Sequence, residues 1–451
     1  MSPEATDLLA LISMFDRQGI PAELLRDGKD QLQFEDAIAP LISYSLVRVE
    51  SGGQSFDLHR LVQLSARQWL KKQGQLHQSA KKSIRIMKEV FPSGDYETSA
   101  ACQMLLPHVK EIIRFIDSLD EGDQLNMSDI TSRCGTYLYL MGKYEQAEAM
   151  HRRALAGREE VLGSEHPDTL SSVNNIGLVL QSQGKYEEAE AMHRQALAGK
   201  EKVLGANHPE TLTGVNNLGS VLQRQGKYEE AEATLRQALA GKEKVLGANH
   251  PDTLISVSNL GMALQSQGKY EEAEAMHRQA LAGKEKVLGA NHPETLISVS
   301  NLGSVLQSQG KYEEAEAMHR RALAASEKVL GAKHHNTLAS LNHLGLVLEI
   351  KGNYKEAEVV HRRVLAGCEE SLDAEHPDTL ASLNNLGMVL QKQGRYEEAE
   401  TMHRRALAGL EKVLGTEHHN TIKSANNFRM VLELQGKYEE ALGSTSEEAL
   451  V

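Results

Sequence analysis

The chain has 451 residues, a formal net charge of −13 and only 4% aromatic residues. Ala, Leu, Glu, Lys and Gln are abundant, which is typical of an all-α protein. The acidic balance argues against a nucleic-acid-binding surface and favours basic or neutral partners. Because the sequence lacks an 18-residue apolar run, a leader pattern and paired cysteines, we predict a cytoplasmic protein with no membrane segment and no disulfides.

Residues 1–75 are predicted to form a small winged-helix domain. Periodicity predicts helix 5–17, helix 21–25, helix 34–44, strand 46–50, strand 55–59 and helix 60–72. Pro21 would begin the second helix, and the turn over 51–54 would join the two strands as a short β-hairpin. Helices followed by such a two-stranded wing indicate the winged-helix class.

Residues 76–127 are predicted to be a helical connector. Two helical stretches, over 77–90 and 98–119, are separated by a loop over 92–95, and the polar stretch 120–124 closes the connector. Eight repeats are predicted over 128–442, and residues 443–451 form a tail.

One tyrosine recurs through the repeats at a constant spacing of 42 residues. Each copy lies in a Gly-x-Tyr-x-x-Ala segment, and the copies are Tyr144, Tyr186, Tyr228, Tyr270, Tyr312, Tyr354, Tyr396 and Tyr438. A unit this short cannot bury its own apolar face and must stack on its neighbours, so the period predicts a solenoid. In the second unit, helix A (170–183) is followed by a glycine turn, helix B (186–203) and a loop that ends at a proline.

The repeats resemble a known family. The Leu-Gly-x-x-Leu pattern of helix A, with the tyrosine segment downstream, resembles the tetratricopeptide repeat (TPR). The period, the Asn-Asn-Leu-Gly segment and the loop Val-Leu-Gly-x-x-His-Pro-x-Thr resemble the repeats of kinesin light chain. The resemblance implies a right-handed superhelical solenoid in which helix A lines a concave groove. The eighth unit has Arg429 in place of the helix A glycine and is predicted to be a degenerate cap.

The amino-terminal domain carries a second resemblance. The segments Phe15-Asp-Arg-Gln-Gly-Ile-Pro21 and Phe56-Asp-Leu-His-Arg-Leu-Val-Gln63 resemble the winged-helix end of the NB-ARC module in fungal STAND (NLR-like) proteins. Cys102-Gln-Met-Leu-Leu-Pro-His108 resembles the connector before the repeats of such proteins. The resemblance implies that the array is a ligand sensor. The chain has no Gly-x-x-x-x-Gly-Lys-Ser/Thr loop, so hydrolysis of a nucleotide by this chain alone is not expected. Three alternatives stay open: a fragment of a longer gene, a truncated paralogue that acts as a decoy, or a chain that works in trans with a separate NB-ARC domain.

His59 is the one residue with an implied nucleotide contact. Leu58-His59-Arg60 aligns with the Met-His-Asp motif of NB-ARC proteins, whose histidine lies near the bound phosphate, but Arg60 replaces the acidic residue. A cofactor contact by His59 is therefore expected only with a nucleotide domain, and the alternative is that His59 begins the next helix. DNA binding by helix 60–72 is disfavoured because its basic residues are scattered among apolar ones.

Histidines recur at one position of helix B. They are His151, His193, His277, His319, His361 and His403, with Leu235 at the same position once. A metal needs ligands at about 2 Å, whereas packed helices lie roughly 8 to 10 Å apart, so packing is favoured and no metal is expected. The pairs His334-His335 and His418-His419 replace His-Pro and are not expected to be ligands. No nucleophile has a convincing base, so we predict neither an enzyme nor a cofactor.

The predicted peptide-binding groove centres on the second asparagine of helix A, which by resemblance contacts the backbone of a bound peptide. We call these residues the asparagine row: Asn175, Asn217, Asn259, Asn301, Asn385 and Asn427, with His343 interrupting it and Arg133 at this position in the first unit. An amide donates and accepts together, as an extended peptide backbone does. The alternative is that these asparagines bond neighbouring helices.

Near-identical units differ mainly along one stripe of helix A. Residues 185–209 and 269–293 are identical, yet four helix A positions vary at spacings of three, four and four, which places them on one helical face. Candidate groove residues on or beside this stripe are Asn174, Asn216, Ser220, Arg224, Met262 and Ser304. We interpret the stripe as tuning of ligand preference, because the charged positions of helix B have not varied comparably. Free drift of an exposed stripe is the alternative.

The predicted function is a noncatalytic scaffold that binds a protein or peptide in the concave groove, as the sensor of a STAND-type signalling protein. One alternative is a kinesin-light-chain-like cargo adaptor, which is disfavoured because no heptad coiled coil precedes the array. Another is a nucleotide-switch component that works with a separate NTPase domain. The imperfect end unit would also permit self-association end to end.

Overall fold

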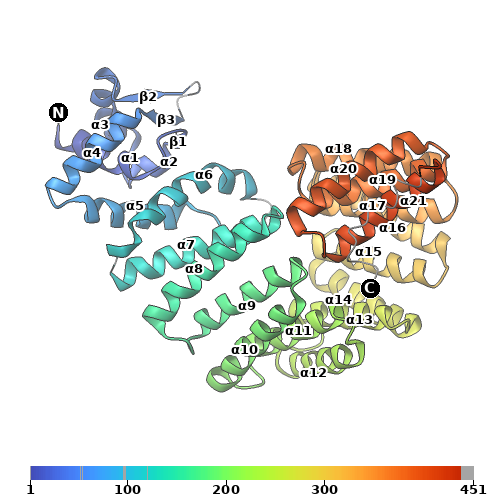
Figure 1. Ribbon diagram of the computed structural model, residues 1–451. Helices are drawn as coiled ribbons and strands as arrows, with labels where there is room; N and C mark the ends of the chain where they lie inside the picture. The colour runs from blue at the N-terminus through green and yellow to red at the C-terminus, as the bar shows by residue number, and fades with distance from the viewer. Residues whose placement is uncertain (1, 51, 53, 95–97, 119, 438–451) are drawn as a thin grey trace. The chain divides into compact units, whose positions relative to one another are not determined.

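The computed structural model describes residues 2–50, 52, 54–94, 98–118 and 120–437. Helices dominate, and one short sheet lies near the amino terminus, as the sequence predicts (Figure 1). The chain divides into two compact units, Met1–Ile176 and Gly177–Val451. The first compact unit contains the small domain, the connector, the first repeat and helix A of the second repeat as far as Ile176, and the second contains the rest of the array.

The described part of the amino-terminal domain has four helices and a three-stranded antiparallel sheet. The helices are α1 (Pro3–Met14), α2 (Glu23–Arg26), α3 (Gln31–Ser43) and α4 (Arg60–Lys72), and the strands are β1 (Ile20–Pro21), β2 (Val47–Val49) and β3 (Ser55–Leu58). The strand order is β1-β3-β2, so the predicted hairpin is confirmed as β2 and β3.

Pro21 does not begin a helix, contrary to the prediction. It lies in β1, paired with Ser55 of β3, and the amide of Ala22 donates to the carbonyl of Gln54 at 2.9 Å. Proline is tolerated on an edge strand because its nitrogen needs no hydrogen-bond partner there. Helix α2 therefore begins only at Glu23.

Capping and aromatic packing support this domain. The Ser2 hydroxyl accepts a backbone amide at the start of α1, and Asp30 and Gln33 form a capping box at the start of α3. Phe34 and Phe56 meet edge to face, with ring centroids 5.8 Å apart. Capping thus fixes where α1 and α3 begin, and the aromatic contact joins α3 to the sheet.

The connector comprises α5 (Leu76–Val90), α6 (Ser99–Ile112) and the 3₁₀ helix η2 (Ile113–Ser118). The polar stretch 120–124 does not close it, because α7 (Glu121–Leu140) already begins there. The Asp120 carboxylate accepts the amide of Asp123 at 2.9 Å, and acidic residues suit the positive end of a helix dipole. Capping residues were mistaken here for a loop.

The described repeats alternate helix A and helix B. The A helices are α7, α9 (Pro167–Ser182), α11 (Pro209–Arg224), α13 (Pro251–Ser266), α15 (Pro293–Ser308), α17 (His335–Ile350), α19 (Pro377–Lys392) and α21 (His419–Leu434). The B helices are α8 (Tyr144–Leu162), α10 (Tyr186–Leu204), α12 (Tyr228–Leu246), α14 (Tyr270–Leu288), α16 (Tyr312–Leu330), α18 (Tyr354–Ser371) and α20 (Tyr396–Leu414). The repeated tyrosine marks the start of each of these B helices, and the solenoid is confirmed. Tyr438 and the tail lie outside the described residues.

A histidine caps the A helices from α9 onward. In α11 the Nδ1 atom of His208 accepts the amide of Glu210 at 3.3 Å, and Pro209 takes the first helical position, where no amide is required. The same cap recurs at His166, His250, His292, His334, His376 and His418. In the two His-His pairs, the first histidine is therefore the cap and the second replaces the proline.

The helix A glycines make room for the helix B histidines. A Cβ atom placed on Gly261 would lie 2.8 Å from Cε1 of His277, closer than non-bonded atoms approach. An added Cβ atom would meet the histidine ring in the same way in five further pairs: Gly135 and His151, Gly177 and His193, Gly303 and His319, Gly345 and His361, and Gly387 and His403. Leu235 takes the place of the histidine against Gly219. These histidines are buried, so their predicted packing between helices is confirmed.

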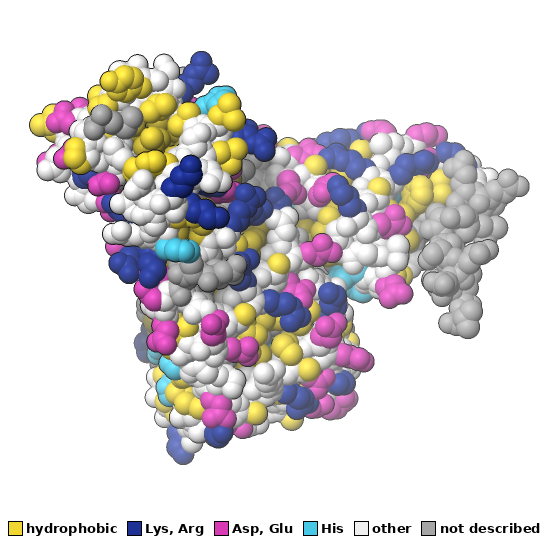
Figure 2. Space-filling view, turned by 60° about the vertical axis from the view of Figure 1, so that its left-hand side comes forward, with side chains coloured by type: hydrophobic (Ala, Val, Ile, Leu, Met, Phe, Trp, Pro, Cys, Tyr) yellow, Lys and Arg dark blue, Asp and Glu magenta, His cyan; other side chains and the backbone are white. Residues whose placement is uncertain are grey.

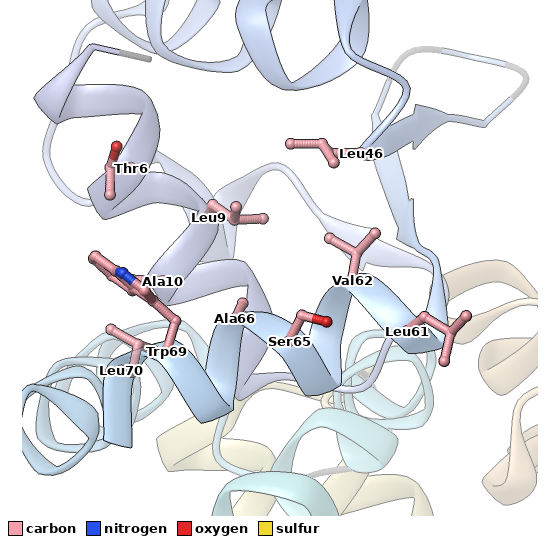
Figure 3. Close-up of a pocket in the computed structure, with 10 residues that line it drawn as sticks. All are labelled: Thr6, Leu9, Ala10, Leu46, Leu61, Val62, Ser65, Ala66, Trp69 and Leu70. Carbon is pink, nitrogen blue, oxygen red and sulfur yellow. The ribbon is translucent and has the colours of Figure 1, made fainter. Parts of the chain in front are cut away.

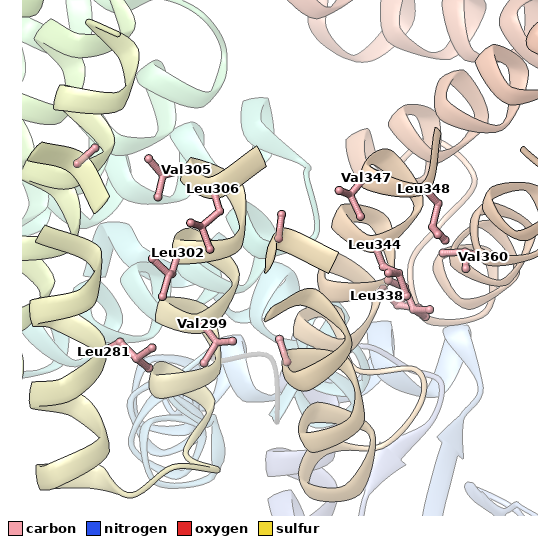
Figure 4. Close-up of a cluster of buried hydrophobic side chains, with 14 of the residues drawn as sticks. Leu281, Val299, Leu302, Val305, Leu306, Leu338, Leu344, Val347, Leu348 and Val360 are labelled. Carbon is pink, nitrogen blue, oxygen red and sulfur yellow. The ribbon is translucent and has the colours of Figure 1, made fainter. Parts of the chain in front are cut away.

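Leucine and valine side chains form a core that continues from repeat to repeat. The cluster in Figure 4 includes Leu302 and Leu306 of α15 and Leu344 and Leu348 of α17, all nearly inaccessible to solvent. Each added unit buries one face against its neighbour, so the core grows with repeat number.

Candidate functional site

Successive A helices of the second unit lie side by side, α11 against α13, α13 against α15, and so on to α21. Glutamines join them: Nε2 of Gln223 donates to the carbonyl of Met262 at 3.2 Å and to Oγ of Ser266 at 2.8 Å. Gln265 donates in the same way to Oγ of Ser308 at 2.9 Å. The A helices therefore form a continuous surface, which we call the A face.

The asparagine row is half-buried in every unit from Asn175 to Asn427. Among the described residues, the side chains of Asn259 and Asn301 have no hydrogen-bond partner, whereas Asn385 donates to Oδ1 of Asn342 at 2.7 Å. Asn259 and Asn301 therefore keep their amide groups free of hydrogen bonds within the described residues, whereas Asn385 uses its amide to join neighbouring A helices.

The two row positions that do not carry asparagine make other contacts. Arg133 of α7 donates to the carbonyls of Lys88 and Phe91, at 3.2 and 2.8 Å, so it holds the connector to the first repeat. The imidazole of His343 is half-buried, with its ring centroid 5.3 Å from that of His319. Burial lowers the pKa of His343, so the ring is neutral near pH 7.

The first asparagine position is less accessible than the second. Asn216 is 5% exposed, and Ser258 and Ser300 at the same position are also buried, although Asn174 is half-buried. These side chains lie between helices, so this predicted part of the groove is largely covered.

The other stripe positions are more open. Arg224 and Met262 are exposed, while Ser220 and Ser304 are half-buried, and Ser304 donates to the carbonyl of Ser300 at 3.1 Å. Ser266 and Ser308, at the Arg224 position, accept hydrogen bonds from the glutamines of the preceding A helix. The stripe therefore mixes accessible side chains with residues that join repeats.

The constancy of the helix B charges has a structural cause. The Glu190 carboxylate accepts from Arg194 at 2.8 Å and from Lys227 of the next repeat at 2.9 Å. The same double ion pair is made by Glu232, Glu274, Glu316, Glu358 and Glu400. Because these charges join repeats, their constancy no longer supports ligand tuning of the helix A stripe.

The buried histidines of helix B are poor proton acceptors. Burial lowers the pKa of His193 and His277 to about 4, so both are neutral near pH 7. Over the residues that the structure describes, no group of three or more His, Cys, Asp or Glu side chains is placed to hold a metal ion. Burial also raises the pKa of the Cys368 thiol, which opposes a nucleophilic role.

His59 lies at the start of α4. Its Nδ1 atom accepts the amide of Leu61 at 3.2 Å, and the side chain is exposed. The contact is the same helix cap that the repeats use at His208. This geometry gives His59 a local role that needs no nucleotide.

An apolar groove between α1 and α4 was missed by the sequence reasoning (Figure 3). It encloses about 550 Å³ and is lined mainly by apolar side chains, including Leu9, Val62 and Trp69. Leu61 and Trp69 remain 66% and 44% exposed, and hydrophobic side chains gather on the upper left of the molecule in Figure 2. The available signal was the row of apolar residues Leu61, Val62, Ala66, Trp69 and Leu70 within α4, which includes the two large side chains that stay exposed.

The described helices include none with the length and apolar character needed to cross a bilayer.

The tetratricopeptide repeat family matches residues 127–202, 171–244, 210–286, 253–328, 294–370, 337–412 and 378–444. The chain belongs to the tetratricopeptide repeat family. Residues 1–75 of this TPR protein also match a domain of unknown function (DUF7779).

A nucleotide-binding leucine-rich repeat (NLR)-like protein of Hyaloscypha variabilis is 39% identical to the TPR protein over 175 residues. The match covers 38% of this chain and only 17% of that relative. A kinesin-light-chain-like structure from Podosopora anserina with nearly identical TPR-like repeats is 31% identical, covering 46% of this chain and 97% of that one, with a TM-score of 0.39. The predicted likeness to an NLR-like protein is therefore found over part of the chain.

Two further structures share the fold at 16% identity. A STAND protein with a tetratricopeptide repeat sensor from Pyrococcus horikoshii has a TM-score of 0.55, covering 98% of this chain and 62% of that one. A Rap protein complexed with competence and sporulation factor has a TM-score of 0.52, covering 78% of this chain and 93% of that one. At this identity the likeness establishes the fold of the TPR protein.

Proposed function

We propose that the A face binds a protein or peptide segment in an extended conformation and that the protein is a noncatalytic scaffold. The observation that carries this proposal is the pair Asn259 and Asn301, half-buried amides whose side chains have no hydrogen-bond partner among the described residues. An extended segment offers alternating N–H and C=O groups that such amides can pair. The Rap protein, of the same fold, is complexed with a factor, which supports this use of the fold.

The biological setting that we propose is ligand sensing in a cytoplasmic NLR-like or STAND-type signalling system. The NLR-like relative and the STAND protein with a TPR sensor support this setting. Ligand bound on the A face would then change how the array acts on a nucleotide-binding partner.

The asparagine row is tested by the triple substitution Asn217→Ala, Asn259→Ala and Asn301→Ala in the full chain. We expect partner capture to fall at least about tenfold, because each lost amide hydrogen bond contributes about 1 kcal/mol. Partners would be identified by mass spectrometry after proximity labelling, with thermal melting measured alongside. Ser266→Ala and Ser308→Ala together are the control, because these serines join repeats. An equal partner list, or a large loss of thermal stability in the triple variant, would contradict the proposal.

The α1/α4 groove supports a second proposal, that the amino-terminal domain docks on a nucleotide-binding domain supplied in trans. Large exposed apolar side chains at a groove are typical of interaction sites. The structure of the STAND protein matches nearly the whole of this chain and extends beyond it, which favours a further domain as the occupant.

This docking is tested with the nucleotide-binding part of the Hyaloscypha variabilis relative as the probe. Leu61→Ser with Trp69→Ser should weaken binding in calorimetry at least about tenfold, because two large apolar contacts are lost. Leu64→Ser is the matched control, since Leu64 is 47% exposed on the same helix but does not line the groove. Equal binding of the probe by all variants would exclude the groove as the docking site. The same titration with and without ADP tests the nucleotide-switch alternative through His59, which would be excluded if ADP left the affinity unchanged.

A further inference from the structure

A buried cation recurs where a B helix meets the next A helix. Lys242 of α12 is 3% exposed, and its Nζ donates to the carbonyl of Asp252 at 3.3 Å. Lys284 of α14 donates to the carbonyl of Glu294 at 3.3 Å and to its carboxylate at 3.1 Å. Burial lowers the pKa of Lys242, which the nearby Asp252 opposes. Each such lysine therefore lies against the first turn of the next A helix, whose acidic residue offsets the buried positive charge.

The residue at the buried-lysine position of helix B and the residue at the first-turn position of the next helix A change together along the chain, with one exception. The pairs at these two positions are Arg158 and Asp168, Lys200 and Glu210, Lys242 and Asp252, Lys284 and Glu294, Ser326 and Asn336, Cys368 and Asp378, and Leu410 and Asn420. Where Ser326 or Leu410 replaces the cation, asparagine replaces the acid. Only Asp378 keeps its carboxylate after the cation has been lost.

A pocket lies at this exception, between α17, α18 and α19. It encloses about 150 Å³, and its lining includes Leu338, Val364, Leu372, Cys368 and Asp378. Cysteine is much shorter than the lysine found at this position in other units, which accounts for the space. Pockets for whole small molecules enclose about 300 to 1,000 Å³, so this one suits a single side chain.

The pocket is continuous with the asparagine row. His343, which holds the row position in this unit, lines the pocket, as does its neighbour Asn342. Nδ1 of His343 has no hydrogen-bond partner among the described residues. A segment lying along the row would therefore pass the mouth of the pocket.

We propose that this pocket takes a lysine side chain, or another primary alkylammonium group, from a segment bound on the A face. The inference rests on the proposed function of that face. The aliphatic stem would pack against Leu338, Val364 and Leu372, and the ammonium would donate to Asp378, as Lys284 does to Glu294. A buried cation is tolerated only with such a partner, and the net charge of −13 also favours basic ligands.

The test uses n-butylammonium chloride, 1-butanol and sodium butyrate as probes of the full chain, read by methyl NMR. We expect n-butylammonium to shift the methyl signals of Leu338, Val364 and Leu372 saturably, about tenfold more tightly than 1-butanol, because a charge-assisted hydrogen bond adds to the apolar contact. Butyrate should cause no shift there, because its charge would face Asp378.

Two substitutions separate the pocket from other binding. Cys368→Lys should abolish the shifts while thermal stability is kept, because the new lysine can donate to the carbonyl of Asp378 as Lys242 does to that of Asp252, with the carboxylate nearby. Asp378→Asn should remove the preference for n-butylammonium over 1-butanol. The fold tolerates this change, because asparagine occupies the equivalent position of the preceding repeat, Asn336. Asn336→Asp, which places an acid at the same position one repeat earlier, is the control and should leave the shifts unchanged.

Three results would overturn the proposal: no shifts with n-butylammonium in the unmodified chain, shifts that persist in Cys368→Lys, or equal binding of 1-butanol. The last result would assign an apolar ligand group to the pocket. The Asn217, Asn259 and Asn301 triple variant should still bind n-butylammonium. Failure of the asparagine row to capture partners is therefore distinguishable from failure of the pocket.

Discussion

At the scale of single residues, the contact between Gly261 and His277 shows how one missing side chain allows two helices to approach. The imidazole occupies the volume that a Cβ atom on residue 261 would need. Glycine weakens a helix by about 1 kcal/mol relative to alanine, so its repeated use in helix A has a packing cause.

Gly261→Ala should destabilise the array by about 1 to 3 kcal/mol despite the better helix propensity of alanine, because the histidine must move. Gly214→Ala is the control within another A helix, where an added Cβ would make only ordinary contact, 3.7 Å from Cδ1 of Leu197. That change should be neutral or stabilising by up to about 1 kcal/mol. Urea unfolding measures both, and equal effects would show that propensity rather than the histidine contact decides.

Sequence predicted that the helix B histidines pack between helices, but not that they meet the helix A glycines. It also treated Asn216 and Asn217 as parts of one groove. Adjacent residues on a helix point about 100° apart, so one of two neighbours can be covered while the other is open. Which of them is covered depends on how the next repeat docks, and the sequence of a single helix does not contain that information.

At the scale of elements, the B helices carry a series of buried neutral imidazoles. Burial lowers the pKa of His151, His193, His277 and His403 to about 4 and that of His319 to about 3. An unfolded histidine titrates near 6.5, so between roughly pH 6.5 and pH 4 the unfolded chain binds more protons than the folded chain. The contribution of these histidines to stability is therefore fully present above about pH 6.5, the pKa of an unfolded histidine. It is lost as the pH falls from there towards about 4.

The free energy of unfolding measured with urea should decrease as the pH is lowered from 7 to 5, by up to about 1.4 kcal/mol per pH unit for each of these histidines. His193→Leu with His277→Leu, which copies Leu235, should flatten this dependence. The measurement is kept above pH 5 because the ion pairs lower the pKa of Glu190, Glu232 and Glu274 to about 2, so their contribution is lost only as the pH falls below about 4.5. An unchanged slope in the double variant would contradict the histidine origin.

Element boundaries were predictable where a periodic signal existed. The tyrosine spacing located the start of each described B helix, and the bounds of α4 agree with the structure. Prediction failed at β1 and at the start of α7, where Pro21 and Asp120 have local roles that depend on a distant strand or on a cap. Long-range pairing and capping act on one or two residues and leave no periodic trace.

At the scale of the whole molecule, the TPR array and the small domain offer two separate surfaces, the A face and the α1/α4 groove. A scaffold that senses a ligand on one surface and reports through the other would use both. Stable capture of a motor subunit in the proximity experiment would instead favour the kinesin-light-chain-like cargo adaptor. The fold was predictable from the repeat period, but the groove depends on how α1 and α4 diverge, which no local pattern encodes.

The double ion pairs of helix B also bear on how such a chain changes in length. Glu190 reaches Arg194 in its own helix and Lys227 in the next unit, and every later glutamate reaches forward by a similar interval. If one complete repeat were removed or added at the boundary between two repeats, each glutamate would therefore still meet an equivalent lysine or arginine of the next repeat. Unequal recombination between nearly identical segments of the gene can thus change the number of units in one step without a new interface having to be selected.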